Sequence, residues 1–159
     1  MITSALLLVV LVATLKSLES VSSAQAFQAN RSSTLDEMRG VLNRMTKDLR
    51  QATSVDATAS TATTVTYTTA INGTATQIVY AASGTGTSAT LTRKVGSGTA
   101  FTVLARLAST NVFTYVNPGT GIQWVEMSLQ VTPARLPTTT LVLDSEVNLR
   151  NRTSALTGS

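Results

Sequence analysis

The sequence predicts an α+β protein, with one long N-terminal helix over about residues 2–52 packed on an antiparallel β-sheet head. Three observations carry this prediction. An uncharged aliphatic stretch opens the chain, an amphipathic helical pattern follows it, and the composition then changes to Thr, Val, Ser and Gly with alternating apolar residues. These boundaries divide the chain into a hydrophobic helix over 1–27, an amphipathic half of the same helix over 28–53 and a head over 54–159.

The N-terminal stretch is the first of these elements. Residues 1–15 carry no charge, and residues 6–13 form an unbroken aliphatic run of the kind that partitions into hydrocarbon. A helix of this length spans only about 22 Å, against about 30 Å for the hydrocarbon core of a bilayer. It needs the mostly uncharged residues that follow Lys16, as far as Asn30, to complete a crossing. We expect a membrane segment here.

A secretory signal peptide is the alternative interpretation of the same stretch. No basic region precedes the aliphatic run, and no break follows it at which a signal peptidase would cut. All 12 basic residues lie C-terminal to the run, so the positive-inside rule alone would place the rest of the chain in the cytoplasm. A basic leader removed in front of Met1 would reverse that orientation. We therefore expect Met1 to be the first residue of a processed chain.

An amphipathic helix is predicted between Leu35 and Ala52. Apolar residues recur there at alternating spacings of three and four, which places them on one stripe of a helix, and the opposite face is charged and includes Asp48. The same register continues upstream and favours one long helix. Two helices with a break at residues 30–34 are the alternative, because Asn, Ser and Thr favour caps. The residues expected to pack the helix on the head are Leu35, Met38, Leu42, Met45 and Leu49.

Strands are predicted throughout the remainder of the chain. Val, Tyr, Ile and Leu alternate with Thr over short runs, and turn residues such as Asn72-Gly73 and Ser83-Gly84 separate these runs. Short connections of this kind indicate an antiparallel meander. The predicted strands cover residues 63–68, 77–80, 89–93, 100–107, 112–116, 122–131 and 140–149.

The composition excludes much chemistry. The chain has no His and no Cys, so it lacks an imidazole base, a thiolate nucleophile, a disulfide and the usual ligands of zinc and iron. Its 8 acidic residues are scattered, without a calcium-loop spacing or a catalytic pair. The net charge of +4 is spread along the chain and does not by itself indicate nucleic-acid binding. We predict no enzyme activity, no cofactor and no metal.

The order of these elements gives a family resemblance. An apolar N-terminal segment, continuous with an amphipathic helix that ends near residue 53 and is followed by an antiparallel sheet, resembles the type IV pilin superfamily, which includes the pilins and the pseudopilins of type II secretion. The second half of the helix is similar to that of minor pseudopilins of the J type. The segments that carry the resemblance are 35–39, 45–52, 91–93, 103–106, 113–115, the strand around Trp124, and 147–151.

The resemblance implies a structural subunit of an extracellular, cell-surface filament that polymerises through its N-terminal helix and serves adhesion, motility or DNA uptake. Such a subunit crosses the cytoplasmic membrane once, is cut by a prepilin peptidase and N-methylated at its new first residue, here Met1, and is assembled by inner-membrane machinery. Its main partners are copies of the same chain. The alternatives are a minor pseudopilin of a type II secretion system and, in another class, a monomeric membrane-anchored surface domain that binds a ligand.

The N-terminal helix is the part to which the resemblance assigns contacts between subunits. Small side chains such as Ser17, Ser20 and Ala24 allow helices to approach closely, which favours helix packing over exposure to lipid. The residues expected to pack in the filament core are Leu6, Leu7, Leu8, Val9, Val10, Leu11, Val12, Leu15 and Phe27.

Three further points concern charge: the fifth residue, a possible ion pair within the helix, and possible contacts with DNA. Family members usually carry Glu at the fifth mature position, which neutralises the terminal amine of a neighbouring subunit, whereas this chain has Ala5. Lys16 and Glu19 are three residues apart and can pair within one helix, so that they are neutral together. Four basic residues would contact DNA phosphates if the filament serves DNA uptake, and the alternative interpretation is that they are ordinary loop charges in solvent. These residues are Arg93, Lys94, Arg150 and Arg152.

Overall fold

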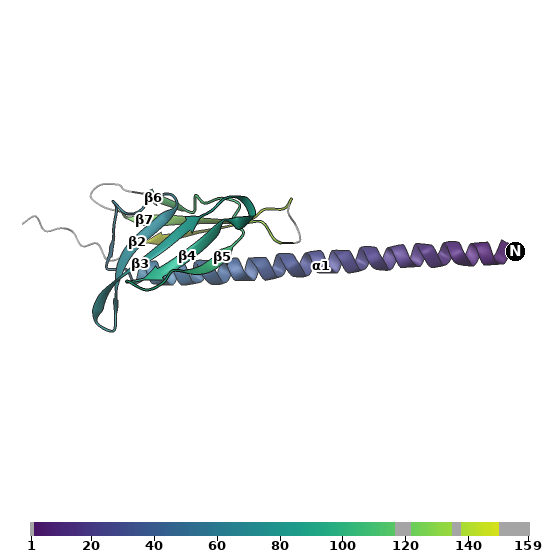
Figure 1. The fold of residues 1–159 in the computed structure, drawn as a ribbon, viewed down its shortest axis with the longest axis horizontal. Helices are drawn as coiled ribbons and strands as arrows, with labels where there is room; N and C mark the ends of the chain where they lie inside the picture. Colours follow the sequence, from purple (N-terminus) through teal and green to yellow (C-terminus); the bar gives the residue numbers. More distant parts are fainter. Residues whose placement is uncertain (1, 117–121, 135–137, 150–159) are drawn as a thin grey trace, which may run out of the picture.

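The chain folds as a long helix with a β head beside its C-terminal half, which confirms the α+β prediction (Figure 1). The computed structural model describes residues 2–116, 122–134 and 138–149, with side chains from Leu11 onward except that of Ala13. The elements are α1 (Ile2–Arg50), β1 (Ser54–Val55), β2 (Thr64–Ile71), β3 (Thr74–Ser83), the short 3₁₀ helix η1 (Gly86–Ser88), β4 (Thr90–Val95), β5 (Phe101–Ala105), β6 (Phe113–Val116), β7 (Trp124–Val131) and β8 (Leu141–Asn148).

α1 runs for 49 residues without a break. Asn30 and Thr34 lie inside the helix, where their side chains donate to carbonyl groups one turn earlier, Asn30 Nδ2 to Ala26 at 2.7 Å and Thr34 Oγ1 to Asn30 at 2.9 Å. The single-helix prediction is therefore confirmed and the two-helix alternative is wrong. α1 ends at Arg50, close to the expected end at residue 52.

The first sheet is a five-stranded antiparallel meander in the order β1-β2-β3-β4-β5. Asn72 and Gly73, with positive φ angles of 51° and 79°, form the tight turn between β2 and β3, as the Asn-Gly pair predicts. β2, β3, β4 and β5 correspond to predicted strands. The sequence does not predict β1, because a strand of 2 residues is too short to show an alternation.

The strands β6, β7 and β8 form a second, three-stranded antiparallel sheet, where the sequence leads us to expect a single sheet. The chain leaves the first sheet at Arg106, whose φ of +61° turns the backbone after β5. Arg106 Nε then donates to the Thr132 carbonyl at 3.0 Å, and Leu107 pairs with Val131 at the end of β7. Alternation predicts strands but does not reveal which strands pair, so it does not detect this change of sheet.

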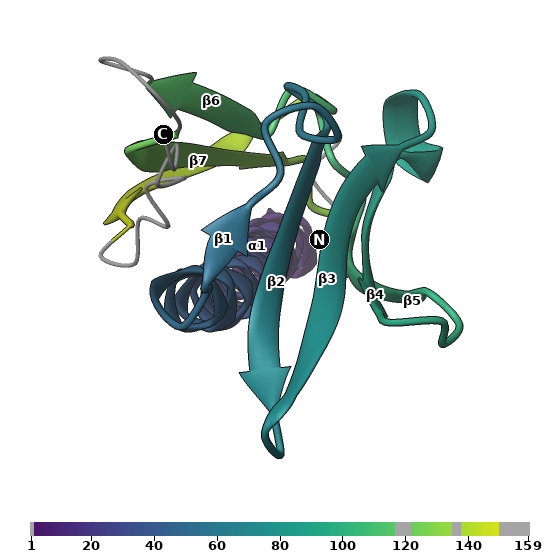
Figure 2. The same ribbon diagram turned by 90° about the vertical axis from the view of Figure 1, so that its left-hand side faces the viewer.

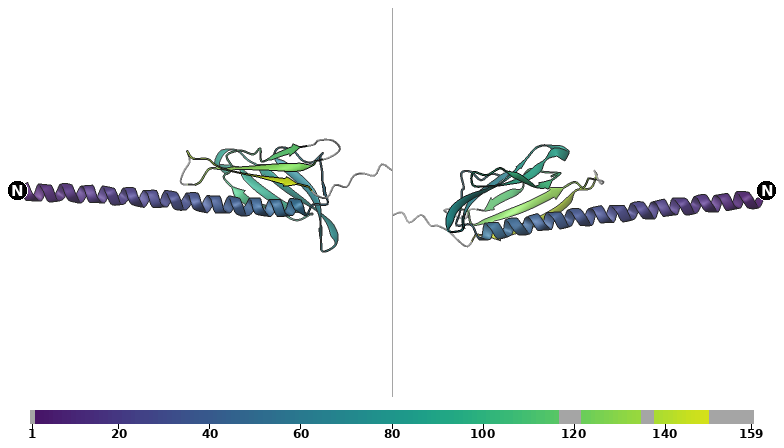
Figure 3. Two further views of the ribbon diagram at one scale, coloured as in Figure 1. Left: turned by 180° about the vertical axis from the view of Figure 1, so that it is seen from behind. Right: turned by 60° about the horizontal axis from the view of Figure 1, so that its bottom comes forward.

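The hydrophobic core lies between the two sheets and the second half of α1. Seen nearly along the helix axis, the first sheet stands to the right of α1 and the second sheet above it (Figure 2). α1 contacts β8 and β7 of the second sheet and β5 of the first. The helix therefore closes the open side between the sheets, and only its second half does so (Figure 3).

Candidate assembly surface

The first half of α1 extends well beyond the head (Figures 1 and 3). From Leu11 to Ser33 every described side chain is exposed except that of Asn30, which is half-buried. From Thr34 onward, buried and half-buried side chains recur at helical spacing. We call residues 2–33 the projecting half and residues 34–50 the docked half.

Large aliphatic side chains of the projecting half lie in solvent. Leu11, Leu15 and Leu18 are 55%, 57% and 66% exposed, and their spacing puts them on one stripe of the helix. Val12, Val21 and Phe27 are also exposed. Large apolar side chains gathered on one exposed stripe are unusual on a soluble monomer and make this stripe a candidate contact surface for protein or lipid.

This apolar stripe faces away from the head. The distance from Leu11 to Met38 corresponds to about seven and a half turns of helix, so the two side chains leave opposite sides of α1. Met38 points into the head, where it is fully buried. The stripe is therefore a separate surface and not an extension of the contact between helix and head.

Lys16 and Glu19 interrupt the apolar character of the projecting half. Both are exposed, and no ion pair joins them within the chain, so the predicted intrahelical pair is not formed. An exposed pair with Lys preceding Glu gains at most a few tenths of a kcal/mol, which is too little to hold two long side chains together. The ion pairs in the described part of the chain are Arg39–Asp36 and Arg93–Asp48.

The docked half buries the stripe that was expected to pack on the head. Met38 and Met45 are 0% exposed, and Leu42 and Leu49 are buried beside them. Leu35 is partly buried and packs against the same core cluster. The structure thus brings these five residues together with both sheets, as the helical spacing indicates.

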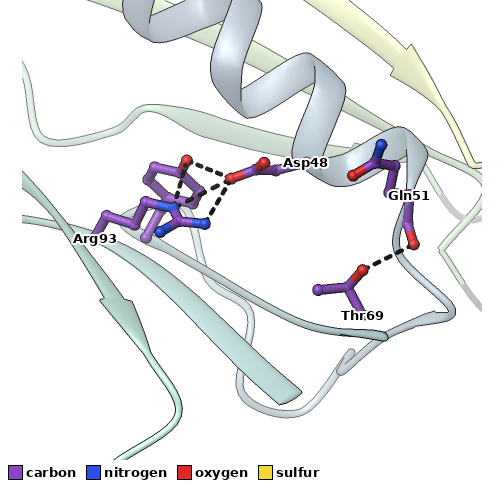
Figure 4. A network of polar contacts seen from close by, with 5 residues as sticks. Asp48, Gln51, Thr69 and Arg93 are labelled. Atoms are coloured by element: carbon purple, nitrogen blue, oxygen red, sulfur yellow. Dashed lines mark hydrogen bonds and ion pairs between the residues drawn. The ribbon is translucent and has the colours of Figure 1, made fainter. Parts of the chain in front are cut away.

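A cluster of polar side chains fastens the end of the docked half to the first sheet (Figure 4). Asp48 Oδ2 accepts hydrogen bonds from the Tyr80 hydroxyl at 2.9 Å and from Nε and Nη2 of Arg93 at 3.1 and 3.0 Å. We call these three residues the Asp48 cluster. Gln51 follows Asp48 by about one helical turn, and its carbonyl accepts a hydrogen bond from the Thr69 hydroxyl at 3.1 Å.

The tyrosines around the Asp48 cluster are held in their neutral form. Burial raises the pKa of Tyr80 and of Tyr67 above the ordinary phenol value, and the negative charge of Asp48 raises both further. The two rings stack with centroids 6.4 Å apart, and the Arg93 guanidinium lies 5.7 Å from the centroid of Tyr80. The Asp48–Arg93 ion pair therefore lies beside two uncharged aromatic rings, those of Tyr80 and Tyr67.

The Asp48 cluster corrects two interpretations of the sequence. The helical spacing places Asp48 on the charged face of α1, opposite the apolar stripe, which suggests that it lies in solvent. Arg93 is interpreted separately, either as a contact to DNA phosphates or as a solvated loop charge. Both are wrong, because the Asp48 and Arg93 side chains are only 17% and 10% exposed and pair with each other. Lys94 is exposed, and Arg150 and Arg152 lie outside the described residues. Sequence spacing carries no signal for a pair formed between a helix and a distant strand.

A groove runs between the docked half and β5, the outermost strand of the first sheet. Its volume is about 360 Å³. Sequence reasoning does not find it, because it forms where two distant segments meet. We call it the β5 groove, and it is lined by Glu37, Gly40, Val41, Arg44, Tyr80, Phe101, Thr102 and Val103.

A second hollow, of about 460 Å³, lies over the outer face of the second sheet and is acidic. Glu126 on β7 stands directly opposite Glu146 on β8, and Asp144 lies beside them. Within the described residues, no group of acidic side chains is arranged to hold a metal ion.

Some predicted residues lie outside what the structure describes. Met1 is one of them, and for Leu6, Leu7, Leu8, Val9 and Val10 the backbone belongs to α1 but the side chains are outside the described set. In the described part of the chain, no stretch of α1 has the length and hydropathy of a membrane span.

No protein-family model matches this chain, and neither a curated protein nor a solved structure shows significant similarity to it.

Proposed function

We propose that this protein is a structural subunit of an extracellular, type IV pilus-like filament, which polymerises through the projecting half of α1 and supports adhesion, motility or DNA uptake. The observation that carries the proposal is the exposed stripe of Leu11, Leu15 and Leu18 on the side of α1 that faces away from the head. Helices gain most of their stability in proteins from packing of an apolar face. Other copies of the same chain would supply that packing.

The geometry of such a contact favours a polymer over a closed dimer. The projecting half carries the apolar stripe, whereas the docked half is already occupied by the head on one side. A contact between the projecting half of one copy and the docked half of another joins two different surfaces. Head-to-tail contacts of this kind leave a free surface at each end and build helical filaments when the rotation does not close.

Before it polymerises, the subunit is anchored in a membrane and processed. The uncharged residues 1–15 hold the chain in the cytoplasmic membrane, and prepilin peptidase and inner-membrane machinery process the subunit and extrude the filament. The subunit acts through its surfaces and has no catalytic role, in keeping with a sequence that contains neither His nor Cys.

Electron microscopy of material sheared from the surface of producing cells, with gold-labelled antibody against the head, tests this function. Long fibres labelled along their length are expected. Short or absent fibres together with a secretion defect would favour the pseudopilin alternative. A chain that stays monomeric at the cell surface would favour the ligand-binding domain and overturn the proposal.

A matched pair of substitutions locates the polymerising surface. Leu15→Asp combined with Leu18→Asp is expected to abolish fibres, because it would bury two unpaired carboxylates between helices. Val142→Asp is the control, since Val142 is 52% exposed on β8 and the change is of the same kind. Fibres that persist in the helix variant, or that disappear equally in both, would contradict the assignment of this surface.

A further inference from the structure

The β5 groove lies beside the docked half of α1, and its lining is chemically mixed. Phe101 is 44% exposed at one side, and Val41 and Val103 are only half-buried. Glu37 and Arg44 are exposed on the helical side of the groove. The groove therefore offers apolar surface with one acidic and one basic side chain beside it.

The backbone around this groove is open to close approach. Gly40 lies between Glu37 and Arg44 on α1, and a Cβ atom added there would meet nothing within 4 Å. On the other side, β5 is the last strand in the sheet order and has no neighbouring strand on its outer edge. Gly40 and the free edge of β5 therefore leave the backbone on both sides of the groove open to a neighbouring chain.

The projecting half carries a stripe that complements this surface. Val12, Leu15, Lys16 and Glu19 follow the spacing i, i+3, i+4, i+7 and so share one side of the helix. None of the four charged residues concerned, Lys16, Glu19, Glu37 and Arg44, takes part in the ion pairs of the described residues. When the projecting half is buried, an unpaired Lys or Glu would be strongly unfavourable, so each needs an opposite charge.

We infer that the β5 groove receives the projecting half of a second copy of this chain, aligned parallel to α1, with Lys16 facing Glu37 and Glu19 facing Arg44. The inference rests on the proposed function and specifies one of its contacts, made by the side of the projecting half that carries Lys16 and Glu19, next to the stripe of Leu11, Leu15 and Leu18. Val12 and Leu15 lie on the side of Lys16 and Glu19 and contact the apolar surface of the groove.

The order of the charges determines the direction of the second helix. Along the projecting half, the basic residue comes before the acidic one, whereas along the groove the acidic residue comes first. Parallel helices therefore bring opposite charges together. Antiparallel helices would set Lys16 against Arg44 and Glu19 against Glu37, which repel.

The same pairs fix the axial offset between the two copies. At 1.5 Å per residue, the Lys16–Glu37 pair requires an offset of about 32 Å and the Glu19–Arg44 pair about 38 Å. Long, flexible side chains can absorb the difference between these values, so an offset near 35 Å satisfies both. An offset of this size leaves about half of α1 in contact with the neighbouring copy.

Charge reversal in producing cells tests the pairing. Lys16→Glu alone and Glu37→Lys alone are each expected to reduce the amount of sheared fibre by about tenfold or more, since one charge is then buried against its like. The double variant restores the attraction and is expected to recover most of the fibre. The matched control is Glu126→Lys, which makes the same change of charge on the second sheet, away from the groove, and is expected to leave the yield unchanged.

The outcomes separate this inference from the proposed function. If wild-type cells make no fibres of this chain, the proposed function fails. If wild-type fibres form but the single reversals leave their amount unchanged, or the double variant does not recover it, the pairing is overturned and the function stands.

Cross-linking gives a second, independent test, because the chain has no Cys of its own. A chain carrying both Lys16→Cys and Glu37→Cys is expected to form a ladder of covalent oligomers in fibres treated with a short thiol-reactive cross-linker. The control carries Lys16→Cys with Arg39→Cys. Arg39 lies about 3 Å from Glu37 along the axis of α1 but on the opposite side of the helix. Equal ladders from both, or a ladder from the control alone, would overturn the groove as the contact. Failure of the Lys16→Cys, Glu37→Cys variant to make fibres would also count against it, because these two thiols remove both members of one pair and introduce no repulsion.

Discussion

The projecting and docked halves of α1 belong to one uninterrupted helix but are stabilised in different ways. The docked half buries Met38, Leu42, Met45 and Leu49 against two sheets, and its charged Asp48 is paired inside the protein. The projecting half has comparable aliphatic side chains, yet they lie in solvent and its Lys16 and Glu19 are unpaired. The same residue types therefore stabilise the monomer in one half, whereas in the other they are available only to a neighbouring molecule or to lipid.

The comparison shows that a hydrophobic pattern on a helix does not by itself identify an intramolecular core. The apolar stripe turns through about half a turn between the two halves, so a single face cannot serve both. A change in the phase of the stripe within one helix marks the point where it passes from one partner to another.

Introducing a charge is expected to destabilise the head strongly in the docked half and hardly at all in the projecting half. Met45→Asp buries a carboxylate without a partner at a position that is 0% exposed, and is expected to lower the free energy of unfolding of the head by more than about 4 kcal/mol. Leu18→Asp, at a position 66% exposed, is expected to change it by less than about 0.5 kcal/mol. Urea unfolding of the full chain, followed by the fluorescence of its 1 Trp, measures both.

A milder variant keeps this test informative if the first chain does not fold. Met45→Ala leaves a cavity and is expected to cost about 2–5 kcal/mol. Similar losses for Met45→Ala and Leu18→Ala would mean that the two halves are not stabilised differently.

Removing an acidic residue separates a buried pair from an exposed one on the same helix. Asp48→Ala leaves the buried guanidinium of Arg93 without its partner and is expected to lower the stability of the head by about 3 kcal/mol. Asp36→Ala removes the partner of Arg39, but those side chains are 61% and 69% exposed, and the loss is expected to stay below about 0.5 kcal/mol. Chemical unfolding at low and at high salt measures the difference, and only the smaller loss should vanish in salt.

Much of the fold is predictable because it depends on local pattern. The spacing of three and four residues predicts both the length of α1 and its buried stripe, and Asn72-Gly73 predicts the turn between β2 and β3. These features depend on neighbours in the sequence, so a single chain contains the information.

The rest depends on contacts between distant residues. The Asp48 cluster joins residues 32 and 45 positions apart, and the β5 groove forms only when α1 meets a strand that begins at Phe101. The separation into two sheets turns on Arg106, whose positive φ is unusual for a residue other than Gly. Composition and alternation are the same for either pairing of the strands, so they do not distinguish one sheet from two.

Alkaline pH is expected to destabilise the head, on which the docked half packs, through the tyrosines of its strands. Burial raises the pKa of Tyr80, Tyr67 and Tyr115, so the folded chain keeps phenol protons that the unfolded chain loses near pH 10. Their contribution is therefore complete below about pH 10 and is lost as the pH rises above it. The slope is at most about 1.4 kcal/mol per pH unit for each tyrosine.

Urea midpoints measured between pH 9 and pH 11.5, with tyrosinate absorbance recorded in parallel, check this loss. Tyr80→Phe removes one of the titrating groups and is expected to give a shallower decline above pH 10, from a lower starting stability because the hydrogen bond to Asp48 is gone. A wild-type midpoint that does not fall over this range would contradict the assignment of neutral, buried phenols.

Exchanging glycine and alanine in the two halves of α1 is expected to change stability only slightly, but it tests whether the halves unfold independently. Gly40 is exposed in the docked half and has open space around it, so Gly40→Ala should raise the stability of the head by up to about 1 kcal/mol through helix propensity alone. Ala29→Gly makes the reverse exchange in the projecting half. It is expected to lower the helix content but to leave the unfolding midpoint of the head unchanged, because the described side chains of that half are exposed apart from Asn30. Circular dichroism reports the helix and Trp124 fluorescence the head. If Ala29→Gly shifted both signals together, the projecting half would be part of the same cooperative unit as the head, and the helix would have to be treated as one element in stability as it is in sequence.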